Sequence, residues 1–498
     1  MKRRLPLLAG LLIGWSSAVT STSLAIASAL EFLTHGPHGV PLVISTFIMV
    51  AVAALGIYGC AAPAHIHRRH VYTAVTITWI VITLLGAIPY VLTGVISNPL
   101  QAWFESTSGF TTVGSSTLSG EYLDHIGYGV GFWRASTQWI GGIGVVVLAV
   151  MALPVLGVGG LELVGAEAPG PTTDKFTPRA NTNAWRLAGV YLTLTVCCAL
   201  FLYSRGLTPF EAVTSSFTTV ATGGFSVKST SFATFSNDPI LLIGLTFFMA
   251  FGATDMGVFW RAWRGQWPSI WVHGELRAYL GWIAVACAIV AGANAFAGVA
   301  DPINSIFTTV SFLTTTGFAS VSWDDWPAIS LFILLVTMFT GGMTGSTTGG
   351  LKILRCQISW QVMKNELMLE QREHQIVAVR IGPGQARIPR NVVRSVLAFH
   401  IAFIVLWLFS VVGTTMYGFD PWTSIAAVTC SMSTIGITLG GLSHGDWSVL
   451  PPGAQFIHII DMLAGRLEIL PMAVTIRTLA EWIRYRSMGW NTSYFADA

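Results

Sequence analysis

The chain has 498 residues, of which 53% are hydrophobic and only 10% are charged, and its formal net charge is +3. Soluble globular proteins carry roughly 25% charged residues, so this composition excludes that class and indicates a membrane protein. We expect an all-α polytopic membrane protein.

Two apolar segments open the chain, one from Leu5 to about Ala29 and one from about Val40 to Ala62. The first follows Lys2, Arg3 and Arg4, so a cleaved signal peptide is an alternative, but its apolar region is longer than a signal peptide requires. We interpret residues 1–70 as two transmembrane helices. The stretch from His65 to His70 would suit a metal site, but it has no adjacent carboxylate or cysteine, which favours a basic cytoplasmic turn.

The remaining apolar segments alternate with four short ones. Eight long segments are predicted near residues 71–92, 129–156, 187–203, 240–260, 280–297, 329–354, 396–417 and 454–479. With the first two they make ten spans of about 20 residues each, the length that crosses a bilayer as helix. We divide the chain into repeats at 71–157, 158–262, 263–355 and 392–498, with a polar linker at 356–391.

Each short segment has the same design. It starts with a capping residue followed by proline, which is typical of a helix N-terminus, and a glycine follows fifteen residues after the proline. Four matches in the same register, each between long apolar spans, predict an internal fourfold repeat. The residues at the ends of the short segments are Thr112, Val113 and Gly114; Thr222, Gly223 and Gly224; Thr315, Thr316 and Gly317; and Thr434, Ile435 and Gly436.

The basic residues fix the expected orientation. They gather before the first span, at residues 68–69, 175–186, 261–277, 352–394 and 477–486, and these groups alternate correctly with ten spans if both termini are cytoplasmic. All four short segments then lie on the outside.

Short helices that enter a membrane and return are tolerated only where protein or a wet cavity surrounds them. Four around one axis would form a pore mouth, with their partially negative C-terminal ends pointing inward and favouring a cation. The residues beyond each helix can present backbone carbonyls to a dehydrated ion. The structural alternative is four re-entrant turns that only pack.

The short segments, together with the repeat, resemble the Trk/Ktr/HKT superfamily of potassium translocators, and most of all its bacterial TrkH-type membrane subunits. The runs that carry the resemblance are 104–114, 138–144, 153–160, 174–179, 221–226, 345–352 and 465–468. It covers nearly the whole chain and implies K⁺ as the ion, a homodimer with one pore in each protomer, and a cytosolic nucleotide-binding regulatory ring of the TrkA type. Ile435 and Ile437 are departures expected to weaken selectivity.

The glycine-rich stretch from Gly341 to Gly350 interrupts the predicted span at 329–354. It lacks the lysine ending of a phosphate-binding loop, since Leu351 follows Gly350. A helix kink is one interpretation. The resemblance instead implies a flexible plug beneath the filter, with Gly345, Gly349, Gly350 and Lys352 as its gating residues.

Arg466 lies in the middle of the last predicted span, where a charge is costly unless it faces water or a partner. A structural ion pair is one alternative, and an arginine that faces the ion path, as the resemblance implies, is preferred. Asp255 is a second departure, where an uncharged residue is expected. It points either to proton coupling or to an ion pair with Arg261 or Arg264.

The sequence therefore predicts a potassium-uptake pore subunit of a bacterial inner membrane, and not an enzyme, because no span pairs a nucleophile with a base. The six cysteines show no metal-ligand spacing and are interpreted as apolar filling. A sodium- or proton-coupled cation symporter, or a less selective cation channel, on the same fold is the alternative function.

Overall fold

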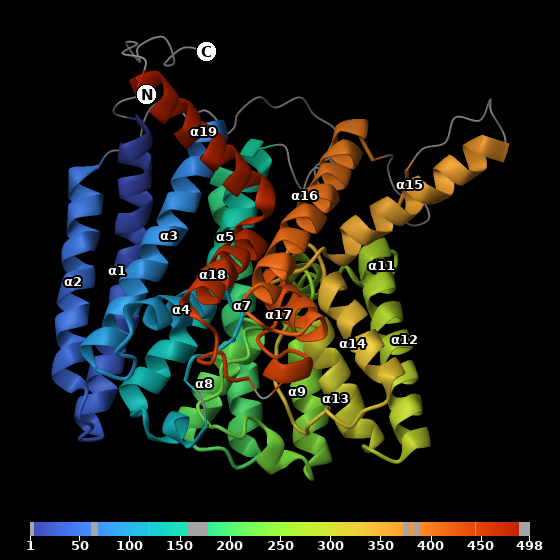
Figure 1. The fold of residues 1–498 in the computed structure, drawn as a ribbon, viewed down its shortest axis with the longest axis horizontal. Helices are drawn as coiled ribbons and strands as arrows, with labels where there is room; N and C mark the ends of the chain where they lie inside the picture. The colour runs from blue at the N-terminus through green and yellow to red at the C-terminus, as the bar shows by residue number, and fades with distance from the viewer. Residues whose placement is uncertain are drawn as a thin grey trace.

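The computed structural model describes residues 4–60, 68–118, 120–156, 178–371, 379–381, 388–443 and 445–487. Within these ranges the regular structure is helical throughout, which confirms the predicted fold class (Figure 1). The expected turn at 65–67 and the motif residues 157–160 and 174–177 lie outside the described ranges. Six of the described helices are long and apolar enough to cross a membrane.

The two leading helices stand outside the repeats. Helix α1 (Arg4–Leu33) packs along α2 (Gly39–Gly59) and also touches α3 and α5. A Cβ on Gly14 would meet the backbone of Gly56. Small residues allow this close approach, which is how transmembrane helices gain packing energy where lipid supplies no hydrophobic driving force.

Four repeats follow, each with a long helix, a short helix and a second long or broken helix. Their bounds are α3 (Arg68–Leu92), α4 (Pro99–Phe110) and α5 (Tyr128–Leu156); α7 (Pro178–Ser204), α8 (Pro209–Val220), α9 (Pro239–Gly252) and α10 (Met256–Trp263); α12 (Gly274–Ala297), α13 (Pro302–Leu313), α14 (Ala328–Thr340) and α15 (Ile353–Gln371); and α16 (Arg390–Thr415), α17 (Pro421–Ser433), α18 (Pro452–Leu467) and α19 (Ile469–Ser487). The short helix α11 (Trp267–Trp271) joins the second repeat to the third.

The repeats close into a ring through their short helices. Each short helix contacts the first helix of its own repeat and the second helix of the repeat before it: α8 contacts α5, α13 contacts α9, and α17 contacts α14. The cycle closes because α4 contacts α18 of the last repeat. The four short helices therefore surround one axis.

The second helix is broken in three of the four repeats. Helices α9 and α10 meet at an angle of 100°, and α14 and α15 are separated by residues 341–352 as the glycine-rich sequence predicted. The continuous spans expected at 240–260 and 454–479 are wrong. The second of these spans breaks at Glu468, which has φ 64°. The cause is Pro471, which has no N–H to donate to the carbonyl of residue 467 and whose ring would clash with that carbonyl in a continuous helix.

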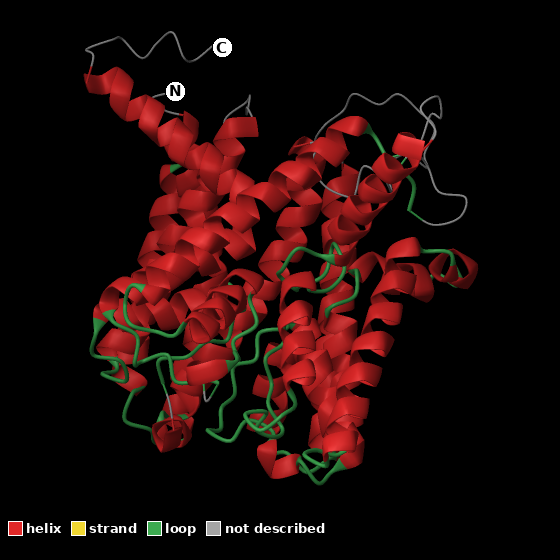
Figure 2. Ribbon diagram, turned by 45° about the vertical axis from the view of Figure 1, so that its right-hand side comes forward, coloured by secondary structure: helices red, strands yellow, loops and turns green. Residues whose placement is uncertain are grey.

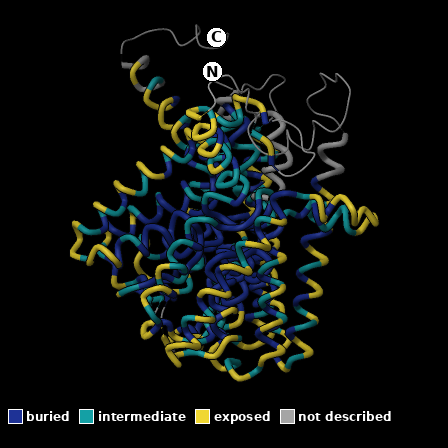
Figure 3. Tube along the Cα trace, turned by 90° about the vertical axis from the view of Figure 1, so that its right-hand side faces the viewer, coloured by how far each residue is buried: buried dark blue, intermediate teal, exposed yellow. Residues whose placement is uncertain are grey.

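Burial is inverted relative to a soluble protein. Large apolar side chains such as Phe47, Phe296 and Phe409 are exposed on the outer helices, while the serines and threonines of the short helices are buried. Figure 3 shows this buried centre within a more exposed periphery. Long loops run through the lower half of the helical body (Figure 2), and the start of α1 and the end of α19 lie together at the opposite end (Figure 1).

Candidate functional site

The four short helices begin with the predicted caps. The side chains of Asn98, Thr208, Asp301 and Asp420 accept from backbone N–H groups of the first turn, and proline follows each of them. In α8 the cap is reciprocal, because the Glu211 carboxylate also accepts from the N–H of Thr208. These bonds satisfy donors that a helix start leaves open, and so fix where each helix enters the ring.

The four helices also end alike. A threonine with left-handed backbone comes first, and a glycine with positive φ comes two residues later. The φ values are 56°, 51°, 54° and 57° at Thr112, Thr222, Thr315 and Thr434, and 89°, 76°, 80° and 95° at Gly114, Gly224, Gly317 and Gly436. Left-handed backbone is rare for a β-branched residue, and such strain concentrates at functional sites.

A short non-helical segment follows each of the four short helices, and we call these segments strands. The four strands contact one another in a closed cycle. A Cβ built on Gly114 would overlap the carbonyl oxygen of Gly223, one on Gly224 that of Thr316, and one on Gly317 that of Ile435. A Cβ on Gly436 would lie 2.5 Å from the carbonyl oxygen of Val113, which completes the cycle. The structure thus brings together all twelve residues predicted from the four short segments.

The carbonyls of Val113, Gly223, Thr316 and Ile435 form a ring. Within the described residues none of them accepts a backbone hydrogen bond, and that of Gly223 accepts from the side chain of Gln138. The N–H groups of Val113, Gly223, Thr316 and Ile435 all turn back to carbonyls five residues earlier, in the short helices. Ile435 therefore shares this backbone hydrogen bond with its three counterparts. Preorganised carbonyls near four helix C-termini suit a dehydrated cation.

A buried ion pair that the sequence analysis missed holds the first two strands together. Glu105 of α4 and Arg134 of α5 are almost fully buried, with 2.8 Å between Oε1 and Nε. The Glu105 carboxylate also accepts from the N–H of Thr117 at 2.7 Å, and Arg134 donates to the carbonyl of Ser226 at 2.9 Å. The guanidinium lies 4.1 Å from the ring centre of Phe225.

Replacing Glu105 by glutamine is expected to leave Arg134 buried without its counter-charge. Breaking one half of a buried pair costs about 3–5 kcal/mol, so we expect lower thermal stability and weaker discrimination between potassium and sodium. The control is Glu481→Gln, which breaks the exposed pair with Arg477 and is expected to change neither. Thermal unfolding in detergent and ion flux measure the two effects; unchanged stability in Glu105→Gln would contradict the role given to the pair.

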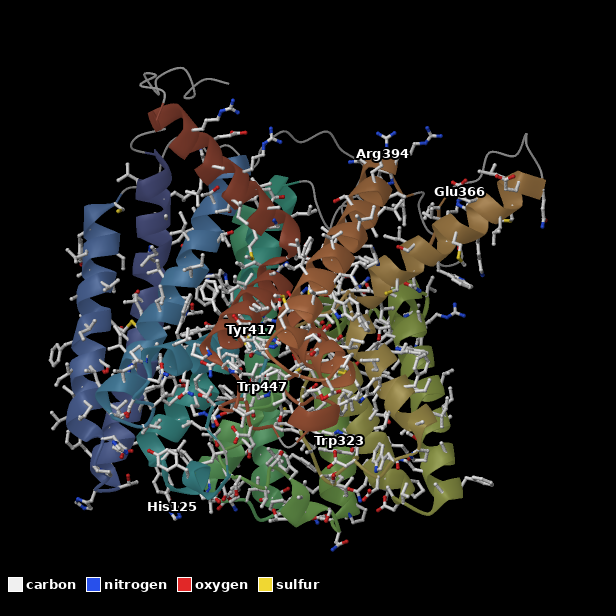
Figure 4. All side chains as sticks on the ribbon, viewed as in Figure 1. His125, Trp323, Glu366, Arg394, Tyr417 and Trp447 are labelled. Carbon is white, nitrogen blue, oxygen red and sulfur yellow. The ribbon has the colours of Figure 1, made fainter. Side chains whose placement is uncertain are left out.

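Further hydrogen bonds hold the second, fourth and first strands. Gln138 of α5 donates to the carbonyl of Gly223 at 2.6 Å and accepts from the N–H of Phe225 at 3.1 Å. Trp323 donates through Nε1 to the carbonyl of Thr438, and the backbone N–H of Trp447 donates to Ser116. Both tryptophans lie in the interior of the lower half (Figure 4).

The glycine-rich segment, residues 341–352, lies against the helix-end side of the ring. The hydroxyls of Thr347 and Thr222 are 3.0 Å apart, and the N–H of Gly349 donates to the hydroxyl of Thr315 at 3.4 Å. A Cβ on Gly349 would overlap the hydroxyl of Thr434. The segment therefore touches three of the four left-handed threonines.

Positive φ values shape this segment. They occur at Gly341, Gly345, Gly350 and Lys352. A side chain on Gly345 would meet the carboxylate of Asp255 at 2.7 Å, and the N–H of Thr344 donates to Glu275 of α12 at 2.6 Å. The glycines are thus required by the fold of the segment and by its close fit against neighbouring acids.

Arg466 reaches the glycine-rich segment from the end of α18. Its Nη1 donates to the carbonyl of Thr347 at 2.5 Å and its Nη2 to the carbonyl of Gly141 at 3.0 Å. The guanidinium thus joins the glycine-rich segment to α5. No carboxylate in the described residues lies within ion-pair distance of Arg466, which argues against the structural ion pair.

Two further acids near the segment, Glu468 and Asp255, bind residues outside it. Glu468 pairs with Arg355 at 2.5 Å. Asp255 caps α10 by accepting from the N–H of Gly257 at 2.9 Å, and it lies 3.8 Å from Arg261. The ion pair with Arg261, one of the two interpretations of Asp255, is therefore present.

The chain is similar to known membrane transport proteins. Residues 38–271 and 284–483 match the family model described as TrkH, cation transport protein. The chain is 34% identical over 450 residues to the Trk system potassium uptake protein TrkH of Halomonas elongata, covering 86% of this chain and 92% of that protein. It is 32% identical over 486 residues to that of Vibrio parahaemolyticus, covering 93% and 97%.

A solved structure shares the fold. The crystal structure of the potassium transporter TrkH from Vibrio parahaemolyticus superimposes with a TM-score of 0.85 at 28% identity, covering 94% of this chain and 98% of that one.

Proposed function

The chain belongs to the TrkH family of cation transport proteins, and on that premise we propose that it takes up potassium ions across a bacterial inner membrane. The ions pass through the ring of Val113, Gly223, Thr316 and Ile435 carbonyls. The observation that carries this proposal is the closed cycle in which each strand's glycine faces a carbonyl of the next. A side chain at any of the four glycines would enter that ring.

The ring suits potassium for a physical reason. A cation sheds its water only where other oxygens replace it, and backbone carbonyls supply these without a fixed negative charge that would hold the ion too tightly. The threonines at 112, 222, 315 and 434 form the inner end of the path, and the hydroxyls of Thr112 and Thr434 have no partner within the described residues.

The glycine-rich segment and Arg466 form the gate in this proposal. The segment lies across the inner end of the ring, touching Thr222, Thr315 and Thr434. Arg466 adds a positive charge and holds the segment through Thr347. Gly345, Gly349, Gly350 and Lys352 allow it to move.

Both termini face the cytoplasm in this proposal. Arg394 and Glu366 lie at the end of the molecule where α1 starts and α19 ends, and His125 lies at the other (Figure 4). The basic residues of α15 and α16 gather at the first end, as the positive-inside rule requires of a cytoplasmic face.

The partners in this proposal are a second copy of the chain and a cytosolic TrkA-type nucleotide-binding ring. The basic residues of the cytoplasmic face that the sequence offers to such a ring are Arg179, Arg264, Lys352, Arg355 and Lys364. The side chain of Arg179 lies outside the described residues, and Arg355 is committed to Glu468 and to the face of Phe399. Exposed Arg264 and Lys364 are the better candidates.

Docking of the ring is therefore expected to weaken as salt rises, because exposed charges are screened within about 8 Å at physiological ionic strength. Arg264→Ala with Lys364→Ala should weaken binding at low salt, while Arg477→Ala serves as a control in the exposed pair with Glu481. Pull-down of the ring across a salt series measures this. Binding that is indifferent to salt would point to an apolar interface.

The function is tested by flux into liposomes that contain purified protein. Potassium, rubidium and sodium gradients are imposed in turn, and the expected result is uptake of potassium and rubidium over sodium. The alternative, a coupled symporter, predicts that potassium uptake follows an imposed sodium or proton gradient. Equal uptake of potassium and sodium would instead favour the less selective channel.

A further inference from the structure

A buried cluster of polar side chains lies behind the fourth repeat, apart from the ring and the gate. Asp461 and His458 are neighbours on α18, and neither side chain is accessible to solvent. Asp461 accepts through Oδ1 from the hydroxyl of Ser410 of α16 at 2.6 Å. His458 Nδ1 lies 2.9 Å from the hydroxyl of Ser431 of α17. The cluster therefore joins three helices of one repeat.

Two atoms of this cluster have no hydrogen-bond partner within the described residues. They are Oδ2 of Asp461 and Nε2 of His458. Nδ1 of His458 lies 4.0 Å from Oδ2 of Asp461, which is too long for a hydrogen bond. Isolated buried charges are so costly that such groups become neutral instead. As described, the cluster is suited to a protonated Asp461 and a neutral His458.

The other ionisable groups around α18 do not compensate Asp461. Arg466 is five residues along the same helix and donates to two carbonyls. Those on the packed helices, among the side chains described, are His70, Tyr72 and Tyr90 of α3; Glu105 of α4 with Arg134; Arg390, Arg394 and His400 of α16, the last bound to Val396; Cys430 of α17 near Gly436; and Arg477 with Glu481 and Arg484 of α19. Among the described residues, His458 is the one basic side chain within 4.0 Å of Asp461.

We propose that Asp461 and His458 form a proton-binding site that controls the fourth pore strand. A proton from water binds at Oδ2 of Asp461 and converts its carboxylate to the neutral acid. When that proton leaves, the carboxylate draws the imidazole of His458 toward it and away from Ser431. The inference rests on the proposed function only in using potassium flux as one of its two measurements.

The site reaches the ring by two routes. Ser431 is three residues before Thr434, so release of its bond to His458 acts on the end of the fourth short helix. The ring of Trp447 meets the imidazole edge-on, with 5.3 Å between centres, and its backbone N–H binds the carbonyl of Ser116 of the first strand. Loss of the proton should loosen the filter and lower potassium flux.

The decisive variant is Asp461→Asn, which keeps the size of the side chain and cannot ionise. Wild-type protein in liposomes is expected to lose potassium flux on the order of tenfold between about pH 5 and about pH 9, in the range of ordinary couplings between sites. Asp461→Asn is expected to keep the low-pH flux throughout. Asp238→Asn, which changes a capping acid outside the cluster, should follow the wild type.

A second measurement does not depend on transport. Infrared difference spectra of detergent-solubilised protein between the two pH limits should show the carbonyl stretch of a buried carboxylic acid, absent in Asp461→Asn and shifted in Ser410→Ala. If Asp461→Asn does not fold, the shift of this band in Ser410→Ala still tests the proposal. A pH profile in folded Asp461→Asn that equals the wild type, or a band unaffected by both changes, would overturn the proposal. Absence of potassium flux in all proteins, with the band present, would instead refute the proposed function.

Discussion

Serine in place of Gly224 is expected to abolish the preference for potassium over sodium. The added Cβ would occupy the place of the Thr316 carbonyl oxygen of the next strand, and φ there is 76°. Left-handed backbone costs a residue with a side chain on the order of 1–2 kcal/mol before any collision. The strand must move, and a shift of the ring by a fraction of an ångström changes the cavity that the ion meets.

The other three glycines should behave alike, because the cycle places each against a neighbouring carbonyl. We expect selectivity to fall by more than about tenfold, or about 1.4 kcal/mol, in Gly114→Ser, Gly317→Ser and Gly436→Ser. Gly298→Ser is the matched control: it also has positive φ, at 69°, but nothing lies within 4 Å of its added Cβ. Competition of sodium with rubidium uptake measures the change. Wild-type selectivity in all four variants would remove these glycines from the ion path.

Neutral Arg466 variants are expected to conduct potassium faster. The guanidinium donates to Thr347 and Gly141 and has no carboxylate to cancel its charge within the described residues. In an effective dielectric of about 20, a unit positive charge opposes a cation at a separation of about 8 Å by about 2 kcal/mol. Arg466→Ala removes both this barrier and the bond that holds the glycine-rich segment, so flux should rise on the order of tenfold.

Lysine at position 466 separates the two contributions. Arg466→Lys keeps the charge and one donor, and is expected to lie nearer the wild type than Arg466→Gln. Arg205→Ala, which removes a partly exposed partner of Asp238, is the control for loss of any arginine. The measurement is unidirectional rubidium flux per folded molecule. Neutral variants that lose flux and stability together would make Arg466 a structural residue, and the gate would lie elsewhere.

The repeat could be predicted from sequence because its signals are local. A cap, a proline and a glycine at fixed spacing specify a short helix and the turn after it, and the structure has all four. The breaks at Ala253 and Glu468 were not predicted, since mean hydropathy does not register a helix end within an apolar segment. Two residues could have indicated these breaks: Asp255, which caps the start of α10, and Pro471, which follows Glu468.

The supports of the ring could not be found in this way. Glu105 and Arg134 are 29 residues apart on different helices, and no periodicity relates them. The same holds for Asp461, which has no acid or base on its own helix face except His458, and which meets Ser410 only through packing of α16 on α18. Long-range pairs of this kind are set by how helices pack, which the spacing of residues along the chain does not specify.

Four strands encoded by one chain have a consequence for how such a filter evolves. The residue whose carbonyl faces the neighbouring glycine is Val113, Gly223, Thr316 or Ile435, so one backbone arrangement tolerates four different side chains. In an assembly of four identical subunits, any substitution would alter all four positions at once. Here a single substitution changes one of the four strands and leaves the other three unchanged. The ion preference can therefore evolve in small steps, without an intermediate that does not conduct.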